Sequence, residues 1–233
     1  LLSRRQRQMC IRDSNKPWKL FALNIVWFFG GYVIQASAVI YYFTYVVQNT
    51  TLVQIVATIT TLVPIVANLC APFLVKLTSK RNLMVGGSFV HMGGLLIIFF
   101  GGTNVPVLLA GAVIAAAGYG LKGSMHFAMQ PDPVDYGEWK TGYRTEGLVN
   151  SACSFGYKIG NGIGSALLGM ILEIGGYVGD AAVQSASALL SIEVCFVWIP
   201  IAVYACGLLI MKFWKLDKEF PQIIADLKAR QTK

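Results

Sequence analysis

Six long apolar stretches dominate the sequence and restrict the folds that it can adopt. Each is long enough to cross the roughly 30 Å hydrocarbon core of a bilayer as a helix. They cover residues 20–47, 52–75, 83–101, 105–129, 146–176 and 185–211. Hydrophobic residues make up 55% of the chain and charged residues only 13%, which is unlike the composition of a soluble domain. The sequence therefore predicts an all-α membrane protein with six transmembrane helices.

Basic residues gather at every second connection between these stretches. Lysine and arginine occur in residues 4–19, 76–81, 140–144 and 212–233. The connections at 48–51, 101–104 and 177–184 contain neither, and Asp180 is the one charged residue there. Because cytoplasmic loops are enriched in lysine and arginine, we expect both termini to be cytoplasmic. The net charge of +8 then reflects orientation in the membrane, and we expect no nucleic-acid partner.

The two ends of the chain differ from its centre. Residues 1–14 do not match the rest in composition and resemble translated adapter sequence, so we interpret them as a non-native segment and exclude them from the fold. Residues 15–216 form the predicted six-helix bundle. In the tail, 217–233, Ile223, Ile224 and Leu227 predict a short amphipathic helix at the membrane interface.

The stretch at 146–176 carries Lys158 near its middle. A charged side chain at the centre of a bilayer costs roughly 2.5–3.5 kcal/mol on insertion scales, so it persists where it is paired, hydrated or used. Polar and small residues follow two different sides of the predicted helix. The polar stripe consists of Ser151, Ser154, Lys158, Asn161 and Ser165, and the glycine ridge of Gly156, Gly160 and Gly164. We expect the ridge to pack on a neighbouring helix and the stripe to face water or substrate.

Lys158 has no obvious carboxylate at its own depth. Glu146 lies about 18 Å away along the same helix, at 1.5 Å per residue. Glu193 lies nearer the opposite membrane surface. Our hypothesis is that the counter-charge of Lys158 comes from outside this sequence.

The connection after residue 129 is rich in charges of both signs. Turn-forming residues, namely Pro131, Pro133, Gly137 and Gly142, favour an irregular loop. The charged residues are Asp132, Asp135, Glu138, Lys140 and Arg144, with Tyr136, Trp139 and Tyr143 between them. Composition leaves two interpretations open. The charges form a solvated loop whose ion pairs contribute little, or they form a gate of breakable ion pairs.

Other polar residues in the stretches favour ordinary structural roles. We expect Lys122 to extend its ammonium group to the interface and His126 to form a hydrogen bond, although a proton-linked role stays open. His91 has no second ligand at helical spacing, so we expect no metal site. The five cysteines, among them Cys10 and Cys153, are scattered without a disulfide pattern.

The run from Asp135 to Leu148, DYGEWKTGYRTEGL, resembles the signature connection of the glycoside-pentoside-hexuronide:cation symporters. This is the melibiose carrier family of the major facilitator superfamily. The Asn-Lys-Pro-Trp motif at 15–18 and the basic connection at 76–81 extend the similarity over residues 15–216. The resemblance implies the carboxy-terminal bundle of a twelve-helix fold, with an amino-terminal six-helix half outside this sequence.

The resemblance also implies a function, the cation-coupled symport of a glycoside, pentoside or hexuronide by alternating access. The coupling cation would be Na+, Li+ or H+, no other cofactor is expected, and the location would be a bacterial inner membrane. By position, Lys158 corresponds to the lysine that joins the cation and sugar sites. The implied sugar-binding residues are Cys153, Ser154, Tyr157, Lys158 and Asn161, and the implied cytoplasmic gate is Asp132, Asp135, Glu138 and Arg144.

The match is not uniform. Gly123 stands where the melibiose carrier has a tryptophan, and Cys153 and Tyr157 replace other residue types. The sequence of the charged run is more similar to that of xyloside and glucuronide carriers.

Two other classes of function were weighed against transport. An intramembrane hydrolase or transferase needs a nucleophile with its base, or paired acids, and no such set is evident in the sequence. We therefore do not expect an enzyme. A non-transporting six-helix scaffold or regulatory half-transporter remains the alternative. The length of the native reading frame would distinguish it from part of a symporter.

Overall fold

The computed structural model describes residues 15–179, 181 and 183–231. The segment interpreted as non-native, including Cys10, and Asp180 lie outside the described residues. All regular structure in the described part is helical. The helices are α2 (Lys16–Tyr41), α3 (Thr50–Leu77), α4 (Lys80–Gly101), α5 (Val105–Met129), α6 (Asp132–Thr141), α7 (Glu146–Ile174), α8 (Ala186–Glu193), α9 (Ile199–Lys212) and α10 (Leu216–Gln231), with π-helical turns η1 (Tyr42–Val46) and η2 (Val194–Trp198).

Five of the described helical segments are long and apolar enough to cross a membrane. They are Lys16–Val46, Thr50–Leu77, Lys80–Gly101, Val105–Thr141 and Ala186–Lys212. The last runs through α8, η2 and α9 without a break. The chain is therefore a multi-pass helical membrane protein, as predicted. The sixth predicted crossing corresponds to α7, which has 29 residues but carries the polar stripe and does not belong to this apolar set.

Capping residues start several helices close to the predicted boundaries. The side chains of Ser79, Asn104 and Ser185 accept hydrogen bonds from the backbone amides three residues later. Such caps satisfy amide groups that a first helical turn leaves unpaired. Two prolines inside α3, Pro64 and Pro72, do not end that helix.

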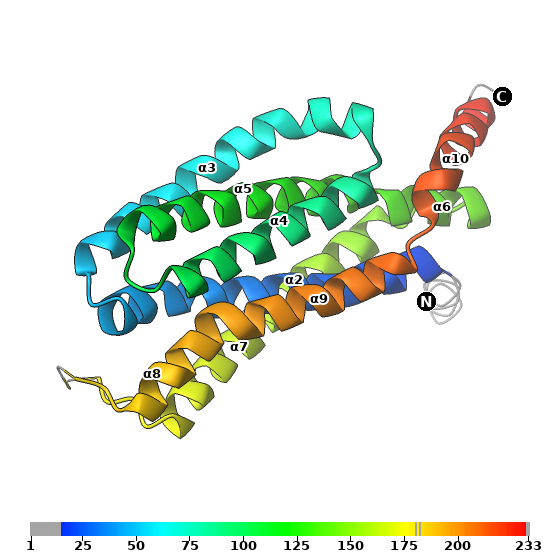
Figure 1. Cartoon of the computed structure of the whole chain (residues 1–233). Helices are drawn as coiled ribbons and strands as arrows, with labels where there is room; N and C mark the ends of the chain where they lie inside the picture. The colour runs from blue at the N-terminus through cyan, green and yellow to red at the C-terminus, as the bar shows by residue number, and fades with distance from the viewer. Residues whose placement is uncertain (1–14, 180, 182, 232–233) are drawn as a thin grey trace.

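The helices form two groups around α2 (Figure 1). On one side α3, α4 and α5 lie together, and on the other α7 and α9 lie along α2. The seam between α4 and α5 depends on glycine, because a Cβ atom at Gly118 would overlap the backbone nitrogen of His91. One buried apolar cluster surrounds Tyr42 and Phe196. The other, around Trp214, lies where α6 and α10 meet the bundle.

The charged connection forms a helix, so the expectation of an irregular loop was wrong. In α6, Pro133 occupies the first turn, where a missing amide hydrogen costs nothing. Asp132 and Asp135 also lie in that turn, where carboxylates favour the helix dipole. Gly142 follows the last turn with φ of 74°, the left-handed conformation that commonly ends a helix. The residues that suggested turns are thus the boundaries of one helix.

The tail forms a short helix, as predicted. This helix, α10, begins at Leu216 and packs on α6 (Figure 1). Ile223 and Leu227 are buried in the protein, in the cluster around Trp214. Part of the predicted apolar face therefore contacts protein side chains, and its place at the membrane interface stays a prediction.

Candidate functional site

Helix α7 has two distinct faces, as its sequence predicted. Its glycine ridge lies against α2, where a Cβ atom at Gly160 would come within 3.0 Å of the Val26 carbonyl oxygen. At Gly164 it would come within 2.8 Å of the Gly30 carbonyl oxygen. Backbones at such separations leave no room for a larger residue. The ridge therefore fixes which side of α7 points away from the bundle.

The residues predicted to bind sugar are not confined to one face of α7, because Cys153 packs on the buried cluster that includes Phe28 of α2. Ser154, Tyr157 and Lys158 are exposed, and Cys153 and Asn161 are half-buried. The ring of Tyr157 meets Phe29 of α2 edge-on, with centroids 4.5 Å apart. Across the described residues Lys158 forms no ion pair, and in particular none with Glu193. The structure thus places an uncompensated ammonium group on an open polar face.

Three of the predicted gate residues meet at the start of α7. The Arg144 guanidinium contacts Asp135 Oδ1 at 2.9 Å and Glu138 Oε2 at 2.8 Å. A third carboxylate, Glu146 Oε2, lies 3.1 Å from Arg144 Nε. The bonds to Glu138, Asp135 and Glu146 raise the pKa of Arg144 above its ordinary value. Sequence reasoning missed Glu146, although its position two residues after Arg144 was a usable signal.

The fourth predicted gate residue, Asp132, belongs to a different pair. Lys80 Nζ lies 2.7 Å from Asp132 Oδ1 and also donates to the Ala128 carbonyl oxygen at 3.0 Å. The Asp132 side chain is only 3% exposed. Burial raises its pKa to about 6, against the opposing effect of Lys80. Lys80 lies in the connection that we had interpreted only as a sign of membrane orientation.

Helix α6 is hydrogen-bonded to α10 and to Asn15, the residue before α2. Trp139 Nε1 donates to Asp226 of α10 at 2.8 Å, and Arg230 donates to the Trp139 carbonyl oxygen at 2.9 Å. Asn15, at the start of α2, donates to the Pro133 carbonyl oxygen at 2.8 Å. Any movement of α6 would therefore be transmitted to α2 and α10.

The interior contains buried polar groups, and the position that we had predicted for Lys122 was wrong. Lys122 does not extend to the interface, because it is 1% exposed and its Nζ lies 3.0 Å from the centroid of the Tyr204 ring. Its helix presents it to the inside of the bundle between α2, α4 and α9. His126 stacks on Phe28 with centroids 4.5 Å apart. Within the described part of the chain, neither Lys122 Nζ nor His126 Nδ1 has a hydrogen-bond partner.

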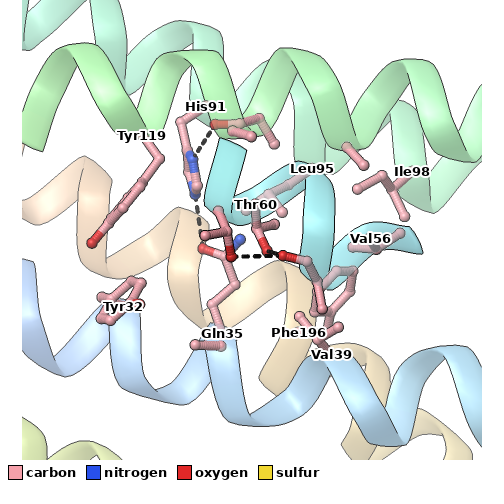
Figure 2. A pocket seen from close by; sticks show the side chains of 16 residues that line it. Tyr32, Gln35, Val39, Val56, Thr60, His91, Leu95, Ile98, Tyr119 and Phe196 are labelled. Atoms are coloured by element: carbon pink, nitrogen blue, oxygen red, sulfur yellow. Dashed lines mark hydrogen bonds between the residues drawn. The ribbon is translucent and has the colours of Figure 1, made fainter. Parts of the chain in front are cut away.

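A cavity of about 170 Å³ opens between α2, α3, α4 and α5. Figure 2 shows His91 pointing into it, with hydrogen bonds to the Ala115 carbonyl oxygen at 2.7 Å and to Gln35 at 2.8 Å. Tyr32 and Tyr119 stack beside it with centroids 4.9 Å apart. The lining residues come from several helices with no shared motif, so the sequence could not show that they meet.

Comparison with known proteins gives a consistent result. A family model described as MFS/sugar transport protein matches residues 6–218. An isoprimeverose transporter of Lactiplantibacillus pentosus is 36% identical over 219 residues, which are 93% of this chain and 45% of the relative. An uncharacterized symporter of Bacillus subtilis (strain 168) is 30% identical over 218 residues, 93% of this chain and 47% of the relative. A glucuronide carrier protein homolog of Escherichia coli (strain K12) is 30% identical over 203 residues, 86% of this chain and 44% of the relative.

The chain spans about half the length of the curated relatives that it matches. The family match covers all the described helices up to the start of α10 and begins at residue 6, inside the segment that we interpreted as non-native. The resemblance inferred from the charged connection is confirmed. The chain belongs to the MFS/sugar transport protein family, which comprises symporters of the glycoside-pentoside-hexuronide type.

Proposed function

We propose that this chain is the carboxy-terminal six-helix bundle of a cation-coupled sugar symporter that works by alternating access. In this proposal α7 is the sixth crossing. Its 29 residues would extend about 43 Å at 1.5 Å per residue, more than the roughly 30 Å of a bilayer core. The names of the relatives, an isoprimeverose transporter and a glucuronide carrier homolog, support a sugar as the substrate.

The observation that carries the proposal is the two-sided packing of α7. A helix that only anchored the bundle would bury its lysine or turn it toward a partner within the bundle. Lys158 does neither, since the glycine ridge occupies the packed side. The open face would meet a second six-helix half, which would supply the carboxylate for Lys158 and the other wall of the sugar site.

Lys158 would couple the cation to the sugar. With the cation absent, its ammonium group would pair with the carboxylates of the other half. Binding of Na+, Li+ or H+ would weaken that pairing and free Lys158 to interact with the sugar. Such differential contacts are what thermodynamic linkage requires. Cys153, Ser154, Tyr157 and Asn161 would line the sugar site beside it.

The Arg144 cluster would act as a gate on the cytoplasmic side of a bacterial inner membrane, with both termini in the cytoplasm. Its three carboxylates come from α6 and the first turn of α7. Separating these helices would break bonds at a partly exposed guanidinium, which is weakly held by comparison with a buried pair. Asp132 would instead anchor α6 to α4 through Lys80.

The test uses the full-length product of the gene that encodes this chain, expressed in bacterial cells with no other carrier for the sugar. Lys158→Ala should abolish accumulation of isoprimeverose or of a glucuronide against a gradient. Lys218→Ala, in α10, is the matched control and should accumulate sugar normally. Unimpaired accumulation by Lys158→Ala would refute the role of Lys158. A wild-type product that moves no sugar would favour a scaffold or regulatory half.

A further inference from the structure

The cavity between α2, α3, α4 and α5 is separate from the polar face of α7. It is lined by residues of these four helices together with Phe196 of η2. Its volume of about 170 Å³ is below the roughly 300–1,000 Å³ of pockets for drug-sized ligands. It also exceeds the share of a single water molecule, about 30 Å³. The space therefore suits one small ring.

The hydrogen bonds of His91 determine what Gln35 presents to this cavity. The Ala115 carbonyl oxygen can only accept, so His91 Nδ1 carries the hydrogen of that 2.7 Å bond. In a neutral imidazole Nε2 must then accept. Its partner at 2.8 Å is the carboxamide of Gln35, drawn with Oε1 toward the ring. Two acceptors cannot bond, so either the ring is doubly protonated or the carboxamide is reversed.

Charge favours the reversed carboxamide. A doubly protonated His91 would be a cation with 2% exposure, and the ammonium group of Lys122 has 1%. Both groups lie against the Tyr204 ring, Lys122 Nζ at 3.0 Å and His91 with centroids 5.0 Å apart. None of the lining residues found in the described chain is a carboxylate. Two buried cations without an anion would be strongly unfavourable.

Reversal also keeps the contact with Tyr204. As drawn, the Tyr204 hydroxyl donates to Gln35 Oε1 at 3.4 Å. After reversal the amide nitrogen has two hydrogens, one for His91 Nε2 and one for the Tyr204 hydroxyl oxygen, which then accepts. The carbonyl oxygen of Gln35 then faces the cavity as an acceptor, held in place by His91.

The threonine hydroxyl groups at the cavity can also accept. Thr60 and Thr61 donate their hydroxyl hydrogens to the Ala57 carbonyl oxygen, at 3.0 and 2.8 Å, which leaves their oxygen lone pairs available. The stacked rings of Tyr32 and Tyr119 form an aromatic wall (Figure 2). Acceptors beside apolar and aromatic walls match a ligand whose hydroxyl groups donate and whose C–H faces are apolar. A metal cation would more commonly be held with carboxylate oxygens.

We propose that this cavity binds one ring of the transported sugar, with Gln35 accepting a hydrogen bond from a sugar hydroxyl and His91 orienting Gln35. This site is distinct from the polar face of α7, and it rests on the proposed transport function. Gln35 would contribute to specificity, because a site built to bond a hydroxyl group discriminates against an analogue that lacks it.

The experiment measures uptake by the full-length gene product with isoprimeverose, a glucuronide and the monodeoxy analogues of whichever is transported. Gln35→Leu should raise the KM about tenfold with little change in maximal rate, as expected for one lost hydrogen bond. One monodeoxy analogue should show a similar increase with the wild type and none with Gln35→Leu. Gln54→Leu, outside the cavity on the exposed surface of α3, is the matched control and should leave both values unchanged.

A second variant guards against failure of Gln35→Leu to fold. Thr60→Val removes an exposed hydroxyl at the cavity and leaves the bonds of His91 intact, and it should raise the KM about threefold. Unchanged KM values in both variants, or a change only in the dependence on Na+, would overturn the cavity site while transport itself stands. No uptake by the wild type would instead overturn the proposed function.

Discussion

Helices α5 and α7 each carry a lysine near the middle of a long segment, yet their surroundings are opposite. Lys122 of α5 is enclosed by aromatic rings and is 1% exposed. Lys158 of α7 lies on an open face, with no ion pair in the described part of the chain. Both helices pack through glycine, but α5 meets neighbours on several sides whereas α7 packs mainly on α2.

A lysine inside an apolar segment therefore has no single structural role. Its depth in the membrane sets the energetic penalty, and the packing of its helix decides how that penalty is met. The ammonium group of Lys122 on α5 is stabilised by cation–π attraction to the rings of Tyr204, Tyr119 and Phe28. On α7 the described residues offer nothing comparable, and Lys158 is exposed.

A substitution at Gly118 gives the strongest test of the packing difference. Gly118→Ala places a methyl group against the backbone of His91 and 2.6 Å from the Gly87 carbonyl oxygen. Because backbone atoms cannot turn aside, we expect the free energy of unfolding to fall by about 3 kcal/mol. Gly162→Ala on the open face of α7 meets nothing within 4 Å and serves as the control.

Thermal unfolding of the purified proteins in detergent measures this difference. The control should be unchanged or more stable by up to about 1 kcal/mol, because alanine favours helix over glycine. Equal losses in both variants would mean that α7 is as tightly enclosed as α5.

The same contrast continues at the ends of the two helices. After α5, Asp132 is 3% exposed and pairs with Lys80, whereas before α7 the Arg144 side chain is 47% exposed. Lys80→Met leaves a buried carboxylate unpaired, so we expect a loss of about 2 kcal/mol at pH 8. Arg144→Gln should cost less than about 1 kcal/mol, as usual for exposed pairs.

The loss of stability in Lys80→Met should also depend on pH. The pKa of Asp132 is raised to about 6, above an ordinary value of about 3.9. The folded state therefore takes up this proton more readily than the unfolded state, and stability falls as pH rises from about 4 to 6. Without Lys80 the pKa rises further, so the loss in Lys80→Met should shrink when unfolding is measured at pH 5. A loss in Lys80→Met that does not depend on pH would mean that Asp132 is hydrated.

Much of the fold was predictable because each element depends on a local signal. The bounds of α5 match the predicted stretch, since Asn104 and Pro106 mark its start and the charged run follows its end. The two faces of α7 followed from spacing alone. Helix α6 was missed because proline and glycine at helix ends and in turns look alike in a sequence. The structure distinguishes the two, because the Gly142 amide bonds to the Glu138 carbonyl oxygen at the end of a helix.

The meeting of three gate residues was predictable because they are close together in the sequence. The sugar-binding residues stay a prediction. The His91 cavity could not be predicted as a site because it depends on the relative rotation of several helices. Lys122 was misplaced for the same reason, since its distance from the end of the helix does not reveal which way the side chain points.

Replacing each lysine by methionine should change the free energy of unfolding differently. In Lys122→Met the side chain keeps its apolar stem and loses an ammonium group that has no hydrogen-bond partner among the described residues. The loss of cation–π attraction opposes the relief of burying a charge, and the relief should prevail, with a gain of about 1 kcal/mol. Lys158→Met should not change stability, because that side chain is exposed. Chemical denaturation in the same detergent compares the two. A clear loss in Lys122→Met would show that the aromatic rings hold the ammonium group more strongly than burial opposes it, and Lys122 would then be a structural cation.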